Sequence, residues 1–172
     1  EWSTLSPSVV INTYSIKTWN GKTIYGYDIT AGGVTVDALT GKNSAGILTP
    51  ITTSLATKGK DIFGNETTGS TDTTYYVANG RLITQSTSST NNSTDVLGST
   101  STTTATTTYT YKKKASNGIE SNWSFGQALS AGDILRYDVV TSSTYSSGKD
   151  IYGGEWSTLS PSVVINTYSI KT

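Results

Sequence analysis

Residues 1–18 read EWSTLSPSVVINTYSIKT, and residues 155–172 read EWSTLSPSVVINTYSIKT, with no substitution between them. An identity of this length is not a chance match, and old duplications normally drift apart in sequence. Within each copy, the segment 8–18 is rich in β-branched and aromatic residues, which favours a strand, and Pro7 stands just ahead of it, where proline is tolerated. The sequence therefore predicts the same β-strand at both ends of the chain.

Two explanations account for the repeat, and both predict a joint between neighbouring units. In the first, units of about 154 residues follow one another in tandem, and 155–172 opens the next unit. In the second, the copy is an engineered complement that completes a subunit normally completed by its neighbour, as in the donor-strand complementation of pilus subunits. A blander alternative is an ordinary edge strand, with the repeat marking only a cut through a string of independent domains.

The residues before the second copy favour the tandem explanation. GKDIYGGE at 148–155 matches GKDIFGNE at 59–66, and the match runs through the junction into Glu155. A Gly-Gly spacer at 153–154 is the rival interpretation. The shared motif lacks the spacing of a phosphate loop. We expect instead a turn module in which glycines fix the backbone and the isoleucine and the aromatic residue pack inward.

Composition argues against several functional classes. The chain has 12 basic and 12 acidic residues, so its formal net charge is zero, which gives no electrostatic footprint for nucleic acid and no attraction to an anionic membrane. It has no cysteine and no histidine, which removes thiolate chemistry, the commonest general base and the commonest metal ligand. No apolar run is long enough to span a membrane. We expect no enzyme, no cofactor and no metal site.

Turn signals divide the chain into short strands. Asn79-Gly80, between 73–78 and 81–84, predicts a tight type I′ hairpin, and Asn20-Gly21 and Asn117-Gly118 predict two more turns. Residues 133–140 alternate, with Leu135, Tyr137 and Val139 expected on one face. The stretch 86–108 is polar and of low complexity. Eight to eleven short strands indicate an all-β fold, a β-sandwich of Ig-like or jelly-roll-like type, completed by a strand from or for a neighbouring unit.

This interpretation divides the chain into a linking strand at 1–18, a β-sandwich body at 19–154, and the identical copy at 155–172. Apolar side chains of the two copies are expected to form the inter-subunit contact. They are Trp2, Val10, Ile11, Tyr14 and Ile16, with Trp156, Val164, Ile165, Tyr168 and Ile170.

Four asparagines lie in N-glycosylation sequons: Asn65, Asn91, Asn92 and Asn122. We expect Asn65 and either Asn91 or Asn92 to be occupied, because they fall in the most loop-like stretches. Exposed tryptophan and tyrosine side chains could instead form a platform for surface glycans, with Trp19 and Trp123 as candidates outside the repeat.

Together these features predict a structural subunit of an extracellular filament, pilus-like fibre or repeat stalk at the cell surface. Its partners are copies of itself, joined head to tail by β-strand complementation. The alternative is an adhesive or carbohydrate-binding β-sandwich module of a tandem-repeat surface protein, which would use repetition for avidity.

Overall fold

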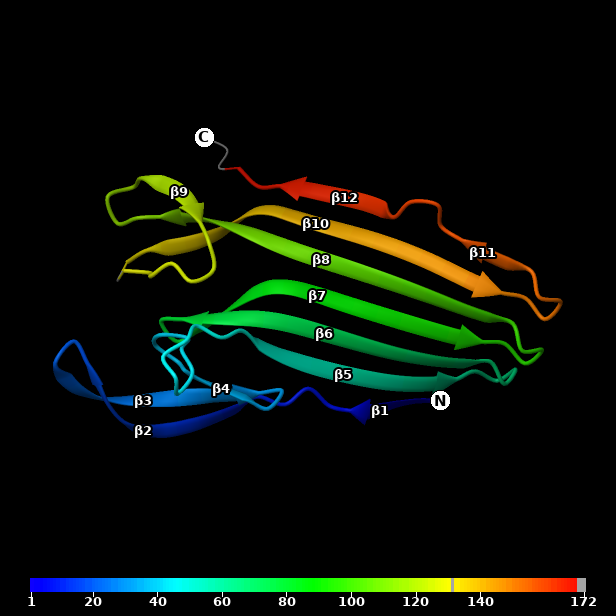
Figure 1. Ribbon diagram of the computed structural model, residues 1–172, viewed down its shortest axis with the longest axis horizontal. Coiled ribbons are helices and arrows are strands. Elements are labelled where there is room, and N and C mark those ends of the chain that lie inside the picture. Colours follow the sequence, from blue (N-terminus) through cyan, green and yellow to red (C-terminus); the bar gives the residue numbers. More distant parts are fainter. Residues whose placement is uncertain (131, 170–172) are drawn as a thin grey trace.

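The structure is a computed structural model that describes residues 1–130 and 132–169, and in this part of the chain it is all-β, as predicted. Twelve strands and no helix are present in those ranges (Figure 1). The strands are β1 (Trp2–Ser6), β2 (Ile11–Trp19), β3 (Lys22–Ala31), β4 (Val34–Asp37), β5 (Ile51–Lys60), β6 (Glu66–Ala78), β7 (Arg81–Thr94), β8 (Thr100–Lys114), β9 (Glu120–Trp123), β10 (Ile134–Lys149), β11 (Glu155–Ser157) and β12 (Ser162–Thr167).

The strands form a nine-stranded and a three-stranded sheet within the described residues. The large sheet has the order β1-β5-β6-β7-β8-β10-β11, with β12 also paired to β10 and β9 to β8, and every pairing is antiparallel. Its centre is a meander of successive hairpins, and β1 and β11 lie at its two opposite edges (Figure 1).

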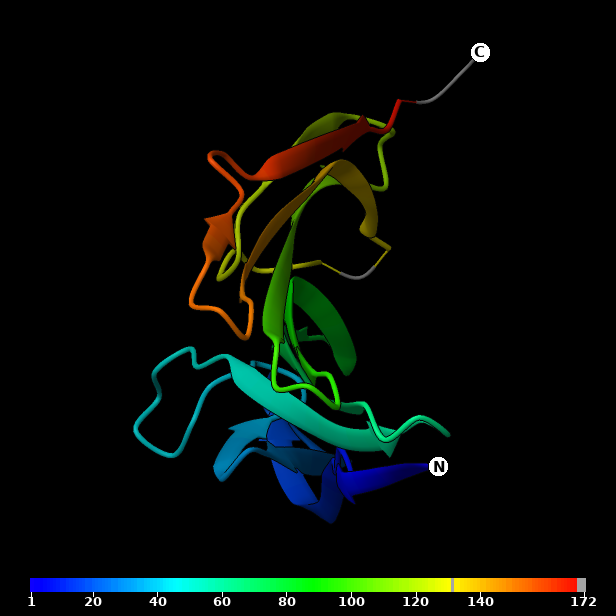
Figure 2. The same ribbon diagram turned by 90° about the vertical axis from the view of Figure 1, so that its right-hand side faces the viewer.

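The small sheet β2-β3-β4 packs its inner face against the large sheet near β5 and β6 (Figure 2). Ile29 of β3 and Val36 of β4 meet Ile51 of β5 and Val77 of β6 in one buried cluster. Burial of these aliphatic side chains holds the two layers together, because removing apolar surface from water is the main favourable term in folding. Two packed sheets around such a core are the arrangement expected of a β-sandwich.

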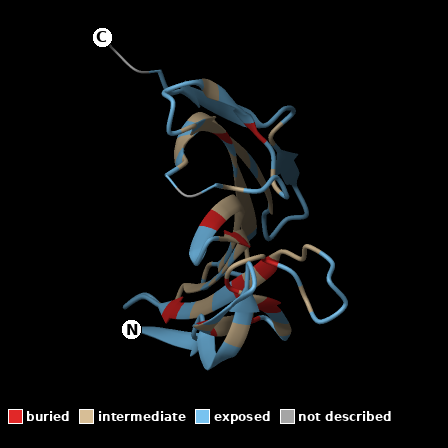
Figure 3. Cartoon of the chain, turned by 90° about the vertical axis from the view of Figure 1, so that its left-hand side faces the viewer, coloured by how far each residue is buried: buried red, intermediate tan, exposed pale blue. Residues whose placement is uncertain are grey.

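A second core lies where the large sheet divides. β7 and β8 are paired only from Ser86–Thr94 to Thr100–Thr108, so their other ends separate. Ile83, Tyr111 and Trp123 are buried together there, and Phe125 packs on them with its ring 5.3 Å from the indole of Trp123. Apart from Val140, the buried apolar residues belong to these two clusters, whereas β1, β11 and β12 are exposed (Figure 3).

The other half of the large sheet is built mainly from serine and threonine. Hydroxyl groups bond across neighbouring strands in this half, as between Thr71 and Ser89 (3.1 Å) and between Thr107 and Ser142 (2.9 Å). The low-complexity stretch 86–108 therefore forms most of two long strands and the turn between them, rather than a structureless segment. β-Branched threonine favours a pleated strand, and cross-strand hydroxyl pairs stabilise it.

The asparagine-glycine turns are confirmed, and one strand face differs from the expectation. Asn20 and Asn79 have positive φ angles of 48° and 49°, as a type I′ turn requires.

In β10, the buried valine is Val140 and not Val139, which was expected to share a face with Leu135. The reason is that the pairing with β8 shifts register between Tyr137 and Val140. A bulge of this kind moves the following side chains to the other face.

Candidate functional site: the two copies of the repeated segment

Each copy of the repeated segment forms two strands separated by a break that includes its proline, at 7–10 in the first copy and 158–161 in the second. The first copy forms β1 and most of β2, and Pro7 lies between these strands. The second copy forms β11 and β12, and Pro161 lies between them. Proline cannot donate a backbone hydrogen bond, so a ladder ends or shifts at its position.

The first copy is held against two different strands. Trp2 of β1 lies opposite Gly59 of β5. One position earlier, Glu1 and Lys60 exchange two backbone hydrogen bonds, of 2.6 and 2.9 Å. After the break, β2 pairs along its whole length with β3, from Ile11 opposite Thr30 to Trp19 opposite Lys22. The first copy thus bridges the large sheet and the small sheet.

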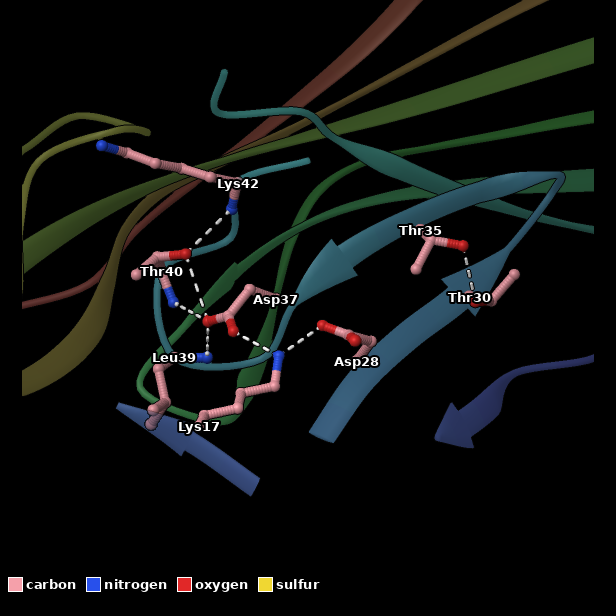
Figure 4. Close-up of polar contacts among 8 residues, drawn as sticks. All are labelled: Lys17, Asp28, Thr30, Thr35, Asp37, Leu39, Thr40 and Lys42. Carbon is pink, nitrogen blue, oxygen red and sulfur yellow. Dashed lines mark hydrogen bonds and ion pairs between the residues drawn. The ribbon is translucent and has the colours of Figure 1, made fainter. Parts of the chain in front are cut away.

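Lys17 fixes the end of this copy to the small sheet. Its ammonium group lies between the carboxylates of Asp28 on β3, at 2.5 Å, and Asp37 at the end of β4 (Figure 4). Partial burial alone would lower the pKa of Lys17, but the bonds to the two carboxylates outweigh it and raise the pKa. Partial burial would likewise raise the pKa of Asp37, whereas Lys17 and the backbone amides of Thr40 and Leu39 lower it.

The second copy lies along one long strand. Trp156 is opposite Gly148 of β10, and Glu155, one position before it, is opposite Lys149, with their charged groups 3.3 Å apart. β12 continues along β10 from Ser162 opposite Thr144 to Thr167 opposite Val139.

One arginine bonds to the second copy just after β12. Tyr168 follows β12, and its carbonyl accepts a bond from Arg136 Nη1 at 2.9 Å. Arg136 is itself held in a bidentate pair with Glu120, at 3.0 and 2.7 Å. The side-chain bond and the charge of Arg136 lower the pKa of Glu120, despite some desolvation.

Both copies therefore meet the same dipeptide in the same register. Glu-Trp of the repeat lies antiparallel to Gly-Lys, at 59–60 for the first copy and at 148–149 for the second. In each case the indole covers the glycine: a Cβ added to Gly59 would meet Trp2 at 2.6 Å, and one added to Gly148 would meet Trp156 at 2.5 Å. Only a residue without a side chain leaves room for the ring at this distance.

The two copies also run in the same direction. Six antiparallel steps separate β1 from β11 across the sheet order, so the two strands are parallel in sense although they occupy opposite edges. A shift of the molecule across its own strands would bring the second copy of one molecule onto the first copy of the next (Figure 1).

The predicted contact residues are mostly exposed within the single chain and are not brought together. Trp2 is 69 % exposed and Trp156 53 %, and the other apolar residues predicted in both copies are likewise largely exposed. Tyr14 and Tyr168 each have a tyrosine neighbour, at ring distances of 5.4 Å to Tyr27 and 5.8 Å to Tyr137. Ile170 lies outside the described residues. One chain alone does not bury the predicted contact surface.

The turn module predicted from the repeated GKDI motif is correct in its backbone and wrong in its side chains. At 61–65 and 150–154 the chain turns between two strands, and the aspartate Oδ1 accepts two backbone N–H bonds at 2.8–3.0 Å. Ile62 is 93 % exposed and Tyr152 90 %, so these side chains point outward instead of packing inward. The core lies at the far end of the sheet, which leaves the turn nothing to pack against.

The same turn occurs at 95–99, where sequence reasoning missed it. Asp95 Oδ1 accepts the N–H groups of Leu97 and Ser99 at 2.9 Å, and Gly98 has a positive φ of 96°. These bonds to Ser99 and Leu97 lower the pKa of Asp95, and the side-chain bond from Asn65 is the main cause of the lowered pKa of Asp61. The spacing Asp-x-x-Gly, which all three turns share, is the sequence signal that could have located the turn at 95–99.

The sequons fall in different surroundings from those expected. Asn91 and Asn92 are exposed on strand β7 rather than in a loop. Asn65 does lie in a turn, but its side-chain amide donates to Asp61 at 2.7 Å and its oxygen accepts the N–H of Val96. Asn122 is exposed on β9.

Other candidate sites are less well formed. Trp123, a candidate for a glycan platform, is buried in the second core, and Trp19 is partly exposed. Three lysines follow one another at 112–114, and Lys112 and Lys113 pair with Asp138 and Asp133, at 3.3 and 3.6 Å. In the described ranges, no three acidic side chains gather as a metal site would require.

Comparison with protein-family models, with curated proteins and with solved structures finds no match to this chain. Across residues 1–130 and 132–169, no helix has the length and apolar character needed to cross a membrane.

Proposed function

We propose that the protein is a structural subunit of an extracellular filament or repeat stalk, assembled head to tail by β-strand complementation. The observation that carries the proposal is the placement of two identical segments at opposite edges of one sheet, in the same direction and on the same Gly-Lys partner. An interface between two different patches of the same molecule generates an open fibre unless the rotation between units closes a ring.

The exposed apolar surface supports self-association. Soluble monomers rarely expose large contiguous apolar patches, and edge strands invite pairing with another chain. Val10, Ile11 and Ile16 are each more than 40 % exposed, and so are Val164 and Ile165 in the second copy. Fully burying a side chain of this size stabilises by about 1.5–3 kcal/mol, so a few of them would make a durable joint.

The body of the unit does not depend on the second copy for its core. The members of both buried clusters fall between residues 27 and 135. A chain ending at Gly154 should therefore fold and leave the outer edge of β10 open to residues 1–18 of another molecule.

Negative-stain electron microscopy of the chain ending at Gly154, beside the full chain, tests the proposal. We expect fibres from the shortened chain and few or none from the full chain, whose own second copy already covers β10. A shortened chain that folds with the same thermal stability yet stays monomeric at high concentration would contradict the proposal. It would favour the adhesive or carbohydrate-binding module, which a glycan array would then test.

A further inference from the structure

We propose that a single copy of the repeated segment pairs with two units at once, one along each of its edges, so that consecutive units share one continuous antiparallel sheet. This inference rests on the proposed head-to-tail assembly and adds its geometry. It differs from a swap in which the segment leaves its own unit to serve only the neighbour.

Outside the bulge between Thr4 and Ser6, the first copy pairs through the backbone groups of its odd-numbered residues. In an antiparallel pair, bonded and non-bonded positions alternate, because successive N–H and C=O groups point to opposite edges. Glu1 and Lys60 form a bonded pair, so Trp2 is in a non-bonded pair with Gly59. A two-residue turn at Asn20-Gly21 makes Trp19 and Lys22 a bonded pair. Because bonded positions alternate, the odd-numbered residues of β2 are the ones whose backbone groups bond to β3.

The second copy uses the backbone groups of its even-numbered residues. Asp150 N–H donates to the carbonyl of Gly154 at 2.9 Å, and Thr158 N–H donates to Ser146 at 2.8 Å. Trp156 lies between these two bonded positions and is therefore also directed to β10. Further along, Tyr168 N–H donates to the carbonyl of Asp138 at 2.8 Å. By the same alternation, the even-numbered residues of β12 direct their backbone groups to β10.

The two sets of groups are complementary. Residue numbers in the copies differ by 154, an even number, so an odd residue in one copy is equivalent to an odd residue in the other. The edge that pairs with β5 and β3 in the first copy is the edge that the second copy leaves unpaired, and the reverse also holds. One segment can therefore satisfy β10 of one unit and β5 and β3 of the next with no hydrogen bond given up.

The side chains of a shared segment would also match on both sides. Its glutamate would stand between Lys149 of one unit and Lys60 of the next, and its tryptophan between Gly148 and Gly59, with the indole covering one of the two glycines. Opposite charges in directly opposed positions stabilise a sheet, and like charges destabilise it. The repeated Gly-Lys would then be the sequence that pairs with Glu-Trp on both neighbouring strands, which explains why it occurs twice.

Residue-resolved amide hydrogen exchange tests this inference on two chains. The first is the 172-residue chain. The second continues it with residues 19–172, so that one middle copy joins two bodies. In the first chain, we expect protection of Ser3, Thr13 and their odd neighbours in one copy, and of Trp156, Val164 and their even neighbours in the other.

In the two-unit chain, we expect both the odd and the even amides of the middle copy to be protected. Their exchange rates should be about tenfold or more below those of amides at an unpaired strand edge. Protection of only one set would overturn the sharing of the segment while leaving head-to-tail assembly intact. Failure of the assembly itself has a different signature, which is the absence of fibres from the chain ending at Gly154.

Two adjacent proline substitutions give a matched control. Proline is tolerated in an edge strand where its nitrogen faces away from the partner. In the 172-residue chain, Val164→Pro should release the second copy from β10, and Ile165→Pro should leave its exchange rates unchanged. In the two-unit chain, Ile165→Pro should return the odd amides of the middle copy to the rates of an unpaired edge. An Ile165→Pro chain with unchanged protection there would overturn the inference.

Discussion

Gly59 and Gly148 determine where the indole rings of Trp2 and Trp156 lie. Each glycine is the last residue but one of a long strand, where glycine is normally unfavourable, and both lie under a tryptophan. A glycine kept in a strand often marks a close approach by another group, and here that group is the indole of the repeat.

Gly59→Val should displace the ring of Trp2, because its Cβ would lie within 3 Å of three ring carbons of the indole. We expect weaker near-ultraviolet circular dichroism from tryptophan and easier quenching of its fluorescence by acrylamide, with the fold retained. Thr57→Val in the same strand is the control and should change neither signal. An unaltered tryptophan spectrum in the Gly59→Val chain would show that the indole does not lie on this glycine.

Lys17→Met should destabilise the chain by about 1–2 kcal/mol, because it leaves the carboxylates of Asp28 and Asp37 without their shared cation. The value lies between those for exposed and buried ion pairs, since all three side chains are partly exposed. Lys22→Met, in the same hairpin, is the control, because Lys22 forms no ion pair with any described residue. Urea denaturation compares the two, and equal midpoints would contradict the role of Lys17.

At the residue scale, the sequence indicated which segment mattered but not what it contacts. Trp2 and Trp156 could be singled out because they belong to the repeat. Their partners were visible only as a repeated Gly-Lys, and nothing local shows that Gly-Lys lies opposite Glu-Trp. Pairing between distant strands depends on the whole topology, which single-sequence patterns do not contain.

Three hairpins at one end of the large sheet use the same element, an aspartate that accepts two backbone N–H groups and a glycine three residues later (Figure 1). The three glycines have positive φ angles between 89° and 96°. Asp and Asn favour the first position of such turns, and glycine alone adopts the last without steric cost.

Gly98→Ala should lower the stability by about 1 kcal/mol, the usual cost of placing a Cβ at positive φ. No described atom lies within 4 Å of the added Cβ, so the effect is conformational and not a clash. Gly98→Asn should recover part of the loss, since asparagine tolerates this backbone region better than alanine. Thermal unfolding of the three chains checks the order glycine, asparagine, alanine, and an alanine chain as stable as the original would contradict it.

Strand prediction succeeded where a turn signal bounded an alternating segment and failed where polarity hid the strand. The hairpin around Asn79-Gly80 is present as predicted, with β6 and β7 on either side. The polar stretch that follows gave no apolar alternation, because both faces of that half of the sheet are lined by hydroxyl groups. Its strands form through long-range pairing with β6 and β10 and through hydroxyl bonds between neighbouring strands.

For the whole molecule, the ionisable groups predict a broad plateau of stability against pH. Five carboxylates have lowered pKa values: Asp37, Asp61, Glu66, Asp95 and Glu120. Their stabilisation is present above their unfolded-state pKa values of about 4 and is lost as the pH falls through their lower folded-state values. Lys17, whose pKa is raised, stabilises below about pH 10.4 and loses this effect as the pH rises through its folded-state value.

The chain has no histidine and no cysteine, so no side chain has an ordinary pKa between about 5 and 9. The melting temperature should therefore be nearly constant from about pH 5 to 9 and should fall in acid. Scanning calorimetry over this range checks the prediction. A steep change in melting temperature near pH 6–7 would contradict it.

In the proposed fibre, the sheet grows in the direction across its strands. Six strand spacings of about 4.8 Å separate equivalent copies across the sheet, and each added unit would extend the sheet in that direction. The strands would then cross the fibre axis at a steep angle, tilted by the twist of the sheet. Units joined end to end as separate beads have no such requirement.

X-ray fibre diffraction from aligned fibres of the chain ending at Gly154 tests this direction of growth. Continuous strand pairing predicts the strand-spacing reflection near 4.8 Å along the fibre axis. A reflection at that spacing perpendicular to the axis would mean that the strands run along the fibre, and it would contradict assembly through the shared strand.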